Sequence, residues 1–196
     1  FDGVIVKSNN IKTNAFRELF ADYDEKIISK ILNHHMTHGG ISRYEKIKFY
    51  YSDYLNQELS NDELNLLGSR FSEIVLNKII EAEYVEGAID FLENIKSQNK
   101  SSFIISGTPQ VELEFIVKKR RLTHLFKRVF GSPRSKDTHI KNLIRERIID
   151  PSKSIYFGDS REDYLAANNN KITYVMIEND QSNNLKLNTT SIPSFS

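Results

Sequence analysis

The sequence contains no cysteine, no apolar run of membrane-spanning length and almost no excess of charge. Without cysteine there is no disulfide and no thiolate, which excludes thiol chemistry and suits a reducing compartment. No apolar stretch approaches the roughly 20 residues of a membrane span, and no signal-peptide pattern opens the chain. The formal net charge is +1, so polyanion binding would need a local basic patch. We therefore expect a soluble, cytoplasmic protein without nucleic-acid or membrane partners.

The composition of 39% hydrophobic and 27% charged residues, over 196 residues, fits one globular unit or a core with an inserted lobe. Residues 1–6 resemble the tail of a buried strand with a turn at Asp2-Gly3, and loop residues follow at 8–10. Four amphipathic helical patterns then run to about residue 80 with no strand between them, which predicts an inserted helical lobe. Their apolar faces are Ala15, Phe16, Leu19 and Phe20; Ile27, Ile28, Ile31 and Leu32; Ile47, Tyr50, Tyr51, Tyr54 and Leu55; and Leu64, Leu67, Phe71, Ile74 and Val75.

Strand-like and helical segments alternate after this lobe. Strands are expected at 102–105, 129–130, 155–157 and 172–177, and helices at 88–95, 111–121, 136–147 and 163–169. This alternation predicts a Rossmann-like parallel β-sheet with helices on both faces, because parallel neighbours require crossover connections. The Asn-, Ser- and Thr-rich segment 179–196 is expected to be poorly ordered or wrapped on the surface.

Polar residues follow the predicted strands, and in a parallel sheet these strand ends share one edge. They are Asp2, Ser106 with Gly107 and Thr108, Lys136, and Asp159 with Asp163. Asp159 and Asp163 are one helical turn apart, so they repel each other unless a cation neutralises them, and oxygen ligands favour magnesium. Carboxylates, a hydroxyl beside backbone amides and a lysine together suit a phosphoryl group held against magnesium.

These motifs, in this order, resemble those of the haloacid dehalogenase superfamily with a helical cap after the first motif, over residues 1–177. Phe1-Asp2-Gly3-Val4 matches the last four positions of the family motif Asp-x-Asp-Gly-Val/Thr. The resemblance implies a nucleophilic aspartate immediately before Phe1. Since the chain opens with Phe1 rather than methionine, we expect at least one upstream residue.

The resemblance also implies a role for each matching residue. Asp2 would act as general acid and base, Ser106 would bind phosphoryl oxygens with the Gly107 amide and Thr108, and Lys136 would offset charge on an aspartyl phosphate.

Metal binding is implied by the same resemblance. Asp159 would be a direct Mg²⁺ ligand, Asp163 would support the metal or the lysine, and the backbone carbonyl of Asp2 would complete the protein ligands.

The segment Gly39-Gly40-Ile41-Ser42-Arg43 resembles the cap loop of β-phosphoglucomutase-like relatives, in which an arginine reaches the substrate. Gly40 and Arg43 are therefore expected to bind substrate, with Lys46 a weaker candidate on the same helix face. A surface arginine at the start of a cap helix is the alternative.

Two further runs are interpreted as structural. Residues 34–38, with three histidines, lack a partner acid at zinc-protease spacing and are interpreted as a loop beside the cleft. The basic run 118–121 falls at a helix C-terminus, where cations complement the helix dipole.

The sequence thus predicts an α/β core of residues 1–9 and 82–196 and a helical cap of residues 10–81. The expected activity is Mg²⁺-dependent hydrolysis of a small phosphorylated, sugar-phosphate-like metabolite, by a monomer or weak dimer. The alternatives are a phosphomutase, or a non-catalytic binding module if the residue before Phe1 is not aspartate.

Overall fold

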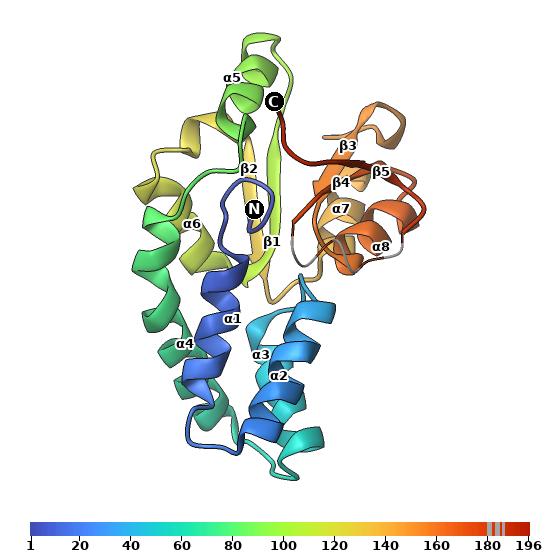
Figure 1. The fold of residues 1–196 in the computed structure, drawn as a ribbon. Helices are drawn as coiled ribbons and strands as arrows, with labels where there is room; N and C mark the ends of the chain where they lie inside the picture. The colour runs from blue at the N-terminus through green and yellow to red at the C-terminus, as the bar shows by residue number, and fades with distance from the viewer. Residues whose placement is uncertain (180–181, 183–184, 186) are drawn as a thin grey trace.

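The computed structural model describes residues 1–179, 182, 185 and 187–196 and consists of two stacked parts (Figure 1). The lower part in this view is a bundle of α1 to α4, which we call the helical lobe. The upper part holds the strands together with the remaining helices, and we call it the α/β lobe. The division into core and cap domains at residues 9/10 and 81/82 stays a prediction.

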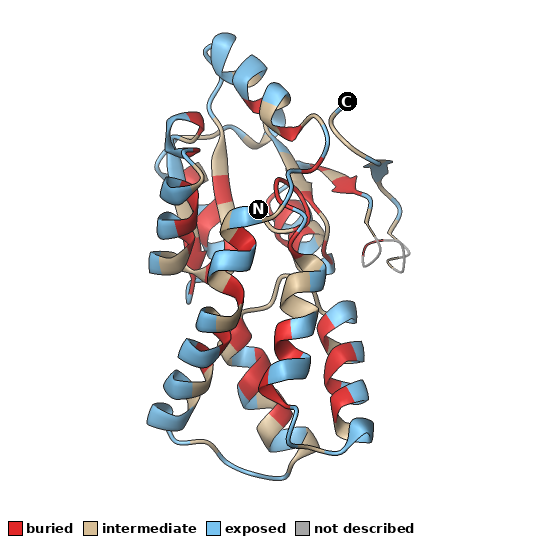
Figure 2. Cartoon of the chain, turned by 60° about the vertical axis from the view of Figure 1, so that its left-hand side comes forward, coloured by how far each residue is buried: buried red, intermediate tan, exposed pale blue. Residues whose placement is uncertain are grey.

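The helical lobe confirms the four predicted helical segments. They are α1 (Asn9–Leu19), α2 (Glu25–Thr37), α3 (Arg43–Phe49), which continues into a π-helical turn (Tyr50–Tyr54), and α4 (Asn61–Glu81). Ser60 and Glu63 form a capping box that starts α4 by satisfying exposed backbone amides. Phe16, Ile31 and Phe71 meet in its apolar core, and the faces turned toward one another are buried (Figure 2).

Two features of this lobe differ from the prediction. Residues 34–37 belong to α2 and His38 caps it, so the interpretation of 34–38 as a loop was wrong. The reason is that the apolar face of α2 extends through His35, which is buried against the lobe core. The predicted third helix also changes to π-helical geometry after Phe49.

The α/β lobe alternates strands and helices as predicted. Its elements are α5 (Ala88–Ser97), β1 (Phe103–Pro109), α6 (Gln110–Lys119), β2 (Arg128–Ser132), α7 (Lys136–Arg145), β3 (Ile155–Gly158), α8 (Arg161–Asn169), β4 (Thr173–Ile177) and β5 (Thr190–Ile192), with 3-10 turns at Thr123–Leu125 and Pro151–Lys153. All strand pairs are parallel: β1 with β2, and β3 with β4 and then β5. The predicted α/β class with a parallel sheet and a helical insertion is confirmed.

The first predicted strand is instead a turn. The amide of Ile5 donates to the carbonyl of Phe1 at 2.8 Å, and the amide of Gly3 donates to the carbonyl of Val6 at 2.8 Å. Because these groups bond within the segment, and only isolated bridges at Asp2–Val6 and Val6–Tyr84 are found in it, no strand is assigned here. The described strands accordingly form two separate sheets.

The N-terminal turn nevertheless unites the two sheets in one apolar core. Val6 is fully buried in a cluster that includes Ile104 of β1 and Ile177 of β4. The site residue Asp2 is thereby anchored against both sheets.

The C-terminal segment is more ordered than predicted. Thr190 pairs with Val175, so that β5 adds a parallel strand to β4, and Phe195 packs on Phe91 and Phe157. Thr190 and Ile192 are β-branched residues, which suit an edge strand. Of the two expectations for this segment, poor order was wrong for these residues, whereas a segment wrapped on the surface agrees with the exposed or half-buried side chains of residues 187–196. Residues 180–181, 183–184 and 186 lie outside the described part.

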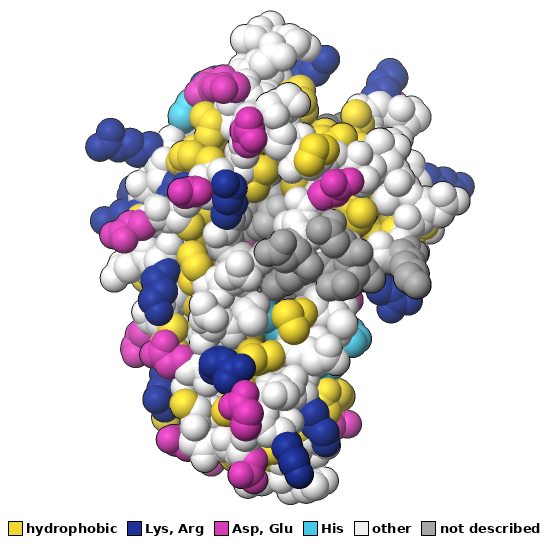
Figure 3. All heavy atoms as spheres, viewed as in Figure 1, with side chains coloured by type: hydrophobic (Ala, Val, Ile, Leu, Met, Phe, Trp, Pro, Cys, Tyr) yellow, Lys and Arg dark blue, Asp and Glu magenta, His cyan; other side chains and the backbone are white. Residues whose placement is uncertain are grey.

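Acidic and basic side chains are interspersed over the face seen in Figure 3. Within the residues that the structure describes, no helix has the length and apolar character needed to cross a membrane.

Candidate active site

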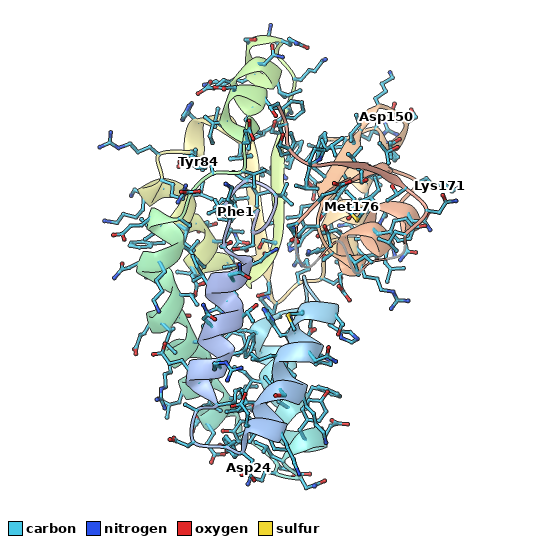
Figure 4. The ribbon with its side chains drawn as sticks, viewed as in Figure 1. Phe1, Asp24, Tyr84, Asp150, Lys171 and Met176 are labelled. Atoms are coloured by element: carbon cyan, nitrogen blue, oxygen red, sulfur yellow. The ribbon has the colours of Figure 1, made fainter. Side chains whose placement is uncertain are left out.

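A cleft of about 700 Å³, counted out to its mouth, lies where the two lobes meet. Phe1, labelled at the centre of Figure 4, is part of its lining. All of the site residues predicted from the sequence line this cleft: Asp2, Gly40, Arg43, Ser106, Gly107, Thr108, Lys136, Asp159 and Asp163. The structure thus brings together residues that are up to 161 positions apart, Asp2 and Asp163.

Asp2 is held as a carboxylate by an ion pair with Lys12, whose Nζ lies 2.6 Å from Oδ2. Ser8 donates a hydrogen bond of 2.6 Å to Oδ1, and Thr108 donates one of 3.1 Å to Oδ2. Burial raises the pKa of Asp2, but the Lys12 ammonium, the amino group of Phe1 and the Ser8 hydroxyl together lower it well below its usual value. Asp2 is therefore ionised in the resting cleft.

Two hydroxyl groups from the end of β1 face this carboxylate. Ser106 and Thr108 are both buried, and the Ser106 Oγ accepts a 3.1 Å hydrogen bond from the Thr108 amide. The Ser106 Oγ lies 3.5 Å from Asp2 Oδ2, at the outer limit of a hydrogen bond. These residues lie within β1, which extends further than the predicted strand because its pairing with β2 resumes at Pro109.

Lys136 and Asp163 form a second buried ion pair, with 2.7 Å between Nζ and Oδ1. Each residue lies in the first turn of a helix that a serine hydroxyl caps, Ser135 for α7 and Ser160 for α8. Ser160 also donates to Asp163 Oδ2 at 2.6 Å, and Tyr156 donates to Oδ1 at 2.8 Å.

The two charges of this pair support each other. Burial lowers the pKa of Lys136, but Asp163, with Asp159 and Glu162, raises it overall, so the ammonium form is stabilised. Burial raises the pKa of Asp163, but Lys136 and the Ser160 hydroxyl contribute to lowering it overall, so the carboxylate is also stabilised. Lys136 is therefore a permanent positive charge in the cleft.

Asp159 lies beside this pair without a cation of its own among the described residues. Its Oδ2 accepts hydrogen bonds from Asn9 at 2.8 Å and Asn179 at 3.0 Å. Burial and the nearby Asp163 carboxylate raise the pKa of Asp159 above its usual value. A bound cation would relieve both effects, since it favours the ionised form.

These residues fit a hard divalent cation that keeps water or substrate oxygens as further ligands. Asp159 can be a direct ligand, whereas both oxygens of Asp163 already accept hydrogen bonds from Lys136, Tyr156 and Ser160. In the described part of the chain no group of three or more His, Cys, Asp or Glu side chains is arranged to hold a metal. The protein would thus contribute few ligands, with Asp159 the central one.

At two positions that line the cleft, Gly40 and Gly107, neighbouring atoms lie too close to leave room for a side chain. Gly40, in the loop between α2 and α3, has φ of +87°, and a Cβ there would lie 2.8 Å from Lys136 Nζ and 2.5 Å from Ser160 Oγ. A Cβ on Gly107 would lie 2.6 Å from the carbonyl oxygen of Gly40. Both glycines therefore allow the loop of the helical lobe to pack closely against Lys136, Ser160 and the end of β1.

Arg43 lines the cleft, but its guanidinium is paired with Glu112 of α6. Nη1 lies 2.9 Å from Glu112 Oε2 and 2.6 Å from the Ser72 hydroxyl, and Nη2 contacts the other carboxylate oxygen. The side chains of Arg43 and Glu112 are 4% and 9% exposed. The Arg43 guanidinium, which was expected to bind substrate, thus forms a bidentate ion pair that links the two lobes.

Lys12 and Asn9, which contact Asp2 and Asp159 respectively, were not predicted from the sequence. Asn9 was assigned to a loop, whereas it opens α1 and lies three positions before Lys12 on the same helical face. That spacing, directly after the first motif, is the signal that could have identified them.

Comparisons with known proteins agree with this geometry. The profile of the haloacid dehalogenase-like hydrolase family matches residues 1–177. A search of curated protein sequences finds no match.

Solved structures share the fold at low sequence identity. A predicted phosphoglycolate phosphatase from Haemophilus somnus has a TM-score of 0.72 and 18% identity, covering 100% of this chain and 92% of its own. A β-phosphoglucomutase from Clostridium difficile has a TM-score of 0.75 and 17% identity, covering 99% and 88%. YfnB from Bacillus subtilis, in a magnesium-bound form, has a TM-score of 0.68 and 18% identity, covering 99% and 92%.

The family match spans most of the chain and includes every predicted motif residue, and the structural neighbours carry the same α/β fold. The chain belongs to the haloacid dehalogenase-like hydrolase family.

Proposed function

We propose that the protein is a magnesium-dependent phosphatase for a small phosphorylated metabolite, acting through an aspartyl phosphate on a residue immediately before Phe1. The observation that carries this proposal is that one cleft holds two ion pairs, Asp2 with Lys12 and Lys136 with Asp163. They supply a proton-transfer group and a fixed positive charge that line the same cleft.

Binding of the phosphoryl group is assigned to the hydroxyls and the lysine. Ser106 and Thr108 point hydroxyl groups toward Asp2, and Lys136 remains charged beside them. These donors match the oxygens of a phosphoryl dianion and the charge that develops as it is transferred.

Asp2 is assigned the proton transfers. Its ionised resting state suits the second half of the reaction, in which a carboxylate takes a proton from the attacking water. The first half needs a protonated acid to donate to the leaving oxygen. The negative charge of an incoming phosphoryl group raises the pKa of Asp2 and competes for Lys12, so substrate binding itself favours protonation.

Magnesium would be held by Asp159, by the backbone carbonyl of Asp2 and through Asp163, and it would supply charge neutralisation for the phosphoryl oxygens. Phosphate release from p-nitrophenyl phosphate should therefore require Mg²⁺ and should stop when EDTA is added. Activity that is unchanged by EDTA and by Mg²⁺ would contradict this part of the proposal.

The decisive test of the activity uses the full-length protein with Asp2→Asn. The amide keeps the shape but cannot take a proton, so turnover of p-nitrophenyl phosphate should fall by about 100-fold or more. Because Lys12 loses its carboxylate, some stability should be lost as well, so turnover is measured well below the melting temperature of the variant. Asp22→Asn, at an exposed acid in the loop after α1, is the matched control and should retain activity. Wild-type turnover in Asp2→Asn would refute the assignment.

Two alternatives are separated by simple observations. For a phosphomutase, Arg43 was the residue expected to hold the second phosphate, and in this structure it is paired with Glu112. Assaying isomerisation alongside phosphate release separates the two activities. A non-catalytic binding module is the better account if the residue before Phe1 is not aspartate.

A further inference from the structure

Lys46 of α3 and His35 of α2 form a buried polar pair in the cleft wall that the helical lobe contributes. Lys46 is 3% exposed, His35 is 6% exposed, and both line the cleft. Lys46 Nζ lies 2.9 Å from His35 Nδ1 and 3.3 Å from the carbonyl oxygen of the same histidine.

The hydrogen bonding of this pair leaves a donor unused. A protonated lysine offers donors only, so Nδ1 of His35 accepts and the ring proton resides on Nε2. Burial and the Lys46 charge hold the pKa of His35 well below its usual value, so the ring is neutral. His35 Nε2 is buried and has no hydrogen-bond partner among the described residues. A buried donor of this kind is normally hydrogen-bonded, and His35 lines the cleft, so Nε2 is available to an acceptor that enters the cleft.

Charge balance in the cleft points the same way. Each of the other cations lining it has its own carboxylate: Lys12 with Asp2, Lys136 with Asp163, and Arg43 with Glu112. Lys46 has no acidic side chain within ion-pair distance in the described structure; besides its bonds to His35, its Nζ lies 5.9 Å from the Phe16 ring centre. Burial, together with repulsion from Lys12, lowers the pKa of Lys46 to about 7. An anion at this position would restore the charged form.

We propose that Lys46 and His35 bind a second acidic group of the substrate, a carboxylate or a phosphate on the leaving-group side. The inference rests on the proposed function, because the phosphoryl group itself is assigned to Ser106, Thr108 and Lys136. Those residues come from the α/β lobe, whereas Lys46 and His35 come from the helical lobe, so the two subsites lie on different walls. Arg43 cannot serve without giving up Glu112.

The test is a binding measurement that needs no turnover. Calorimetric titration of the full-length protein compares propylphosphonate, 3-phosphonopropanoate and ethane-1,2-bisphosphonate, which share a phosphonate and differ in the far group. We expect one acid-bearing phosphonate to bind at least about tenfold more tightly than propylphosphonate, as charge-assisted hydrogen bonds provide. Which of the two shows the gain identifies carboxylate or phosphate.

Variants attribute the preference to the pair. Lys46→Met should abolish it while the affinity for propylphosphonate stays within about twofold, and His35→Phe should weaken it. Lys48→Met, at an exposed lysine on the same helix, should keep it. The inference is overturned if the wild-type protein binds no phosphonate or shows no preference for either acid-bearing phosphonate. It is also overturned if the preference survives in Lys46→Met.

The wild-type comparison stands even if a variant fails to fold. Failure of the proposed function would be seen separately, as wild-type-like turnover of p-nitrophenyl phosphate by Asp2→Asn. A preference lost in Lys46→Met together with such turnover would support the subsite and refute the assignment of Asp2.

Discussion

Replacing Lys46 by methionine should change how the stability of this protein depends on pH. Lysine has an ordinary pKa of 10.5, and burial, followed by repulsion from Lys12, lowers that of Lys46 to about 7 in the folded protein. Between these two values the unfolded chain binds a proton that the folded protein has released. The free energy of unfolding contributed by Lys46 therefore rises with pH in this window.

The magnitude follows from the two pKa values. Each pH unit within the window raises the free energy of unfolding by about 1.4 kcal/mol when Lys46 is fully deprotonated in the folded protein. At pH 7 about half of the folded molecules still carry the proton, so the gain between pH 7 and pH 9 is about 2 kcal/mol. Lys46 is 3% exposed, so solvent screening is small. The charged groups that act on it are Lys12, Lys136 and Glu162. They are present in both proteins, so their own titration largely cancels in the difference.

The assay is urea denaturation of ligand-free wild type, Lys46→Met and Lys48→Met at pH 7, 8 and 9. The wild type should gain about 2 kcal/mol relative to Lys46→Met over this range, whereas exposed Lys48 should make no difference when replaced. If the free energy of unfolding of wild type and Lys46→Met changes with pH in the same way, Lys46 is not a buried lysine without a carboxylate partner. That result would remove support for the second anion subsite.

Two further predictions concern the contact between the lobes. Glu112→Gln leaves Arg43 buried without its carboxylate and should cost about 3–5 kcal/mol in urea denaturation, against little change for exposed Glu114→Gln; a loss below about 1 kcal/mol would contradict a buried ion pair. Gly40→Ala places a Cβ 2.8 Å from Lys136 Nζ at φ of +87°, so kcat/KM should fall by about tenfold or more through displacement of the loop. Gly39→Ala, at a glycine outside the left-handed region, should be tolerated, and equal activity of the two variants would argue against close packing at residue 40.

Local pattern was enough to predict most of the fold. Helical periodicity and βα alternation depend on neighbours within a few residues, so the four lobe helices and the parallel strands could be recognised directly. The short N-terminal segment was misread, because an apolar run of this length is compatible with a strand or with a turn that buries Val6. The pairing of Thr190 with Val175 could not be predicted either, since strand pairing is a long-range contact.

The motif residues of the site could also be predicted, because the ends of parallel strands meet at one edge. That rule grouped Ser106, Lys136, Asp159 and Asp163, which all line one cleft, although Ser106 lies inside β1 rather than after it. Asp2 lines the same cleft, but it lies in a turn and not at the end of a strand. Their chemical types alone indicated phosphoryl transfer.

Only the tertiary structure decided the partners of these groups. The sequence shows an arginine at position 43, but only the fold brings it to Glu112 of α6, 69 residues away. The sequence likewise shows lysines at positions 12 and 46, but only the fold pairs Lys12 with a carboxylate and Lys46 with a neutral histidine. The charge and pKa of a buried side chain depend on what surrounds it in three dimensions, and neighbours along the chain do not determine those surroundings.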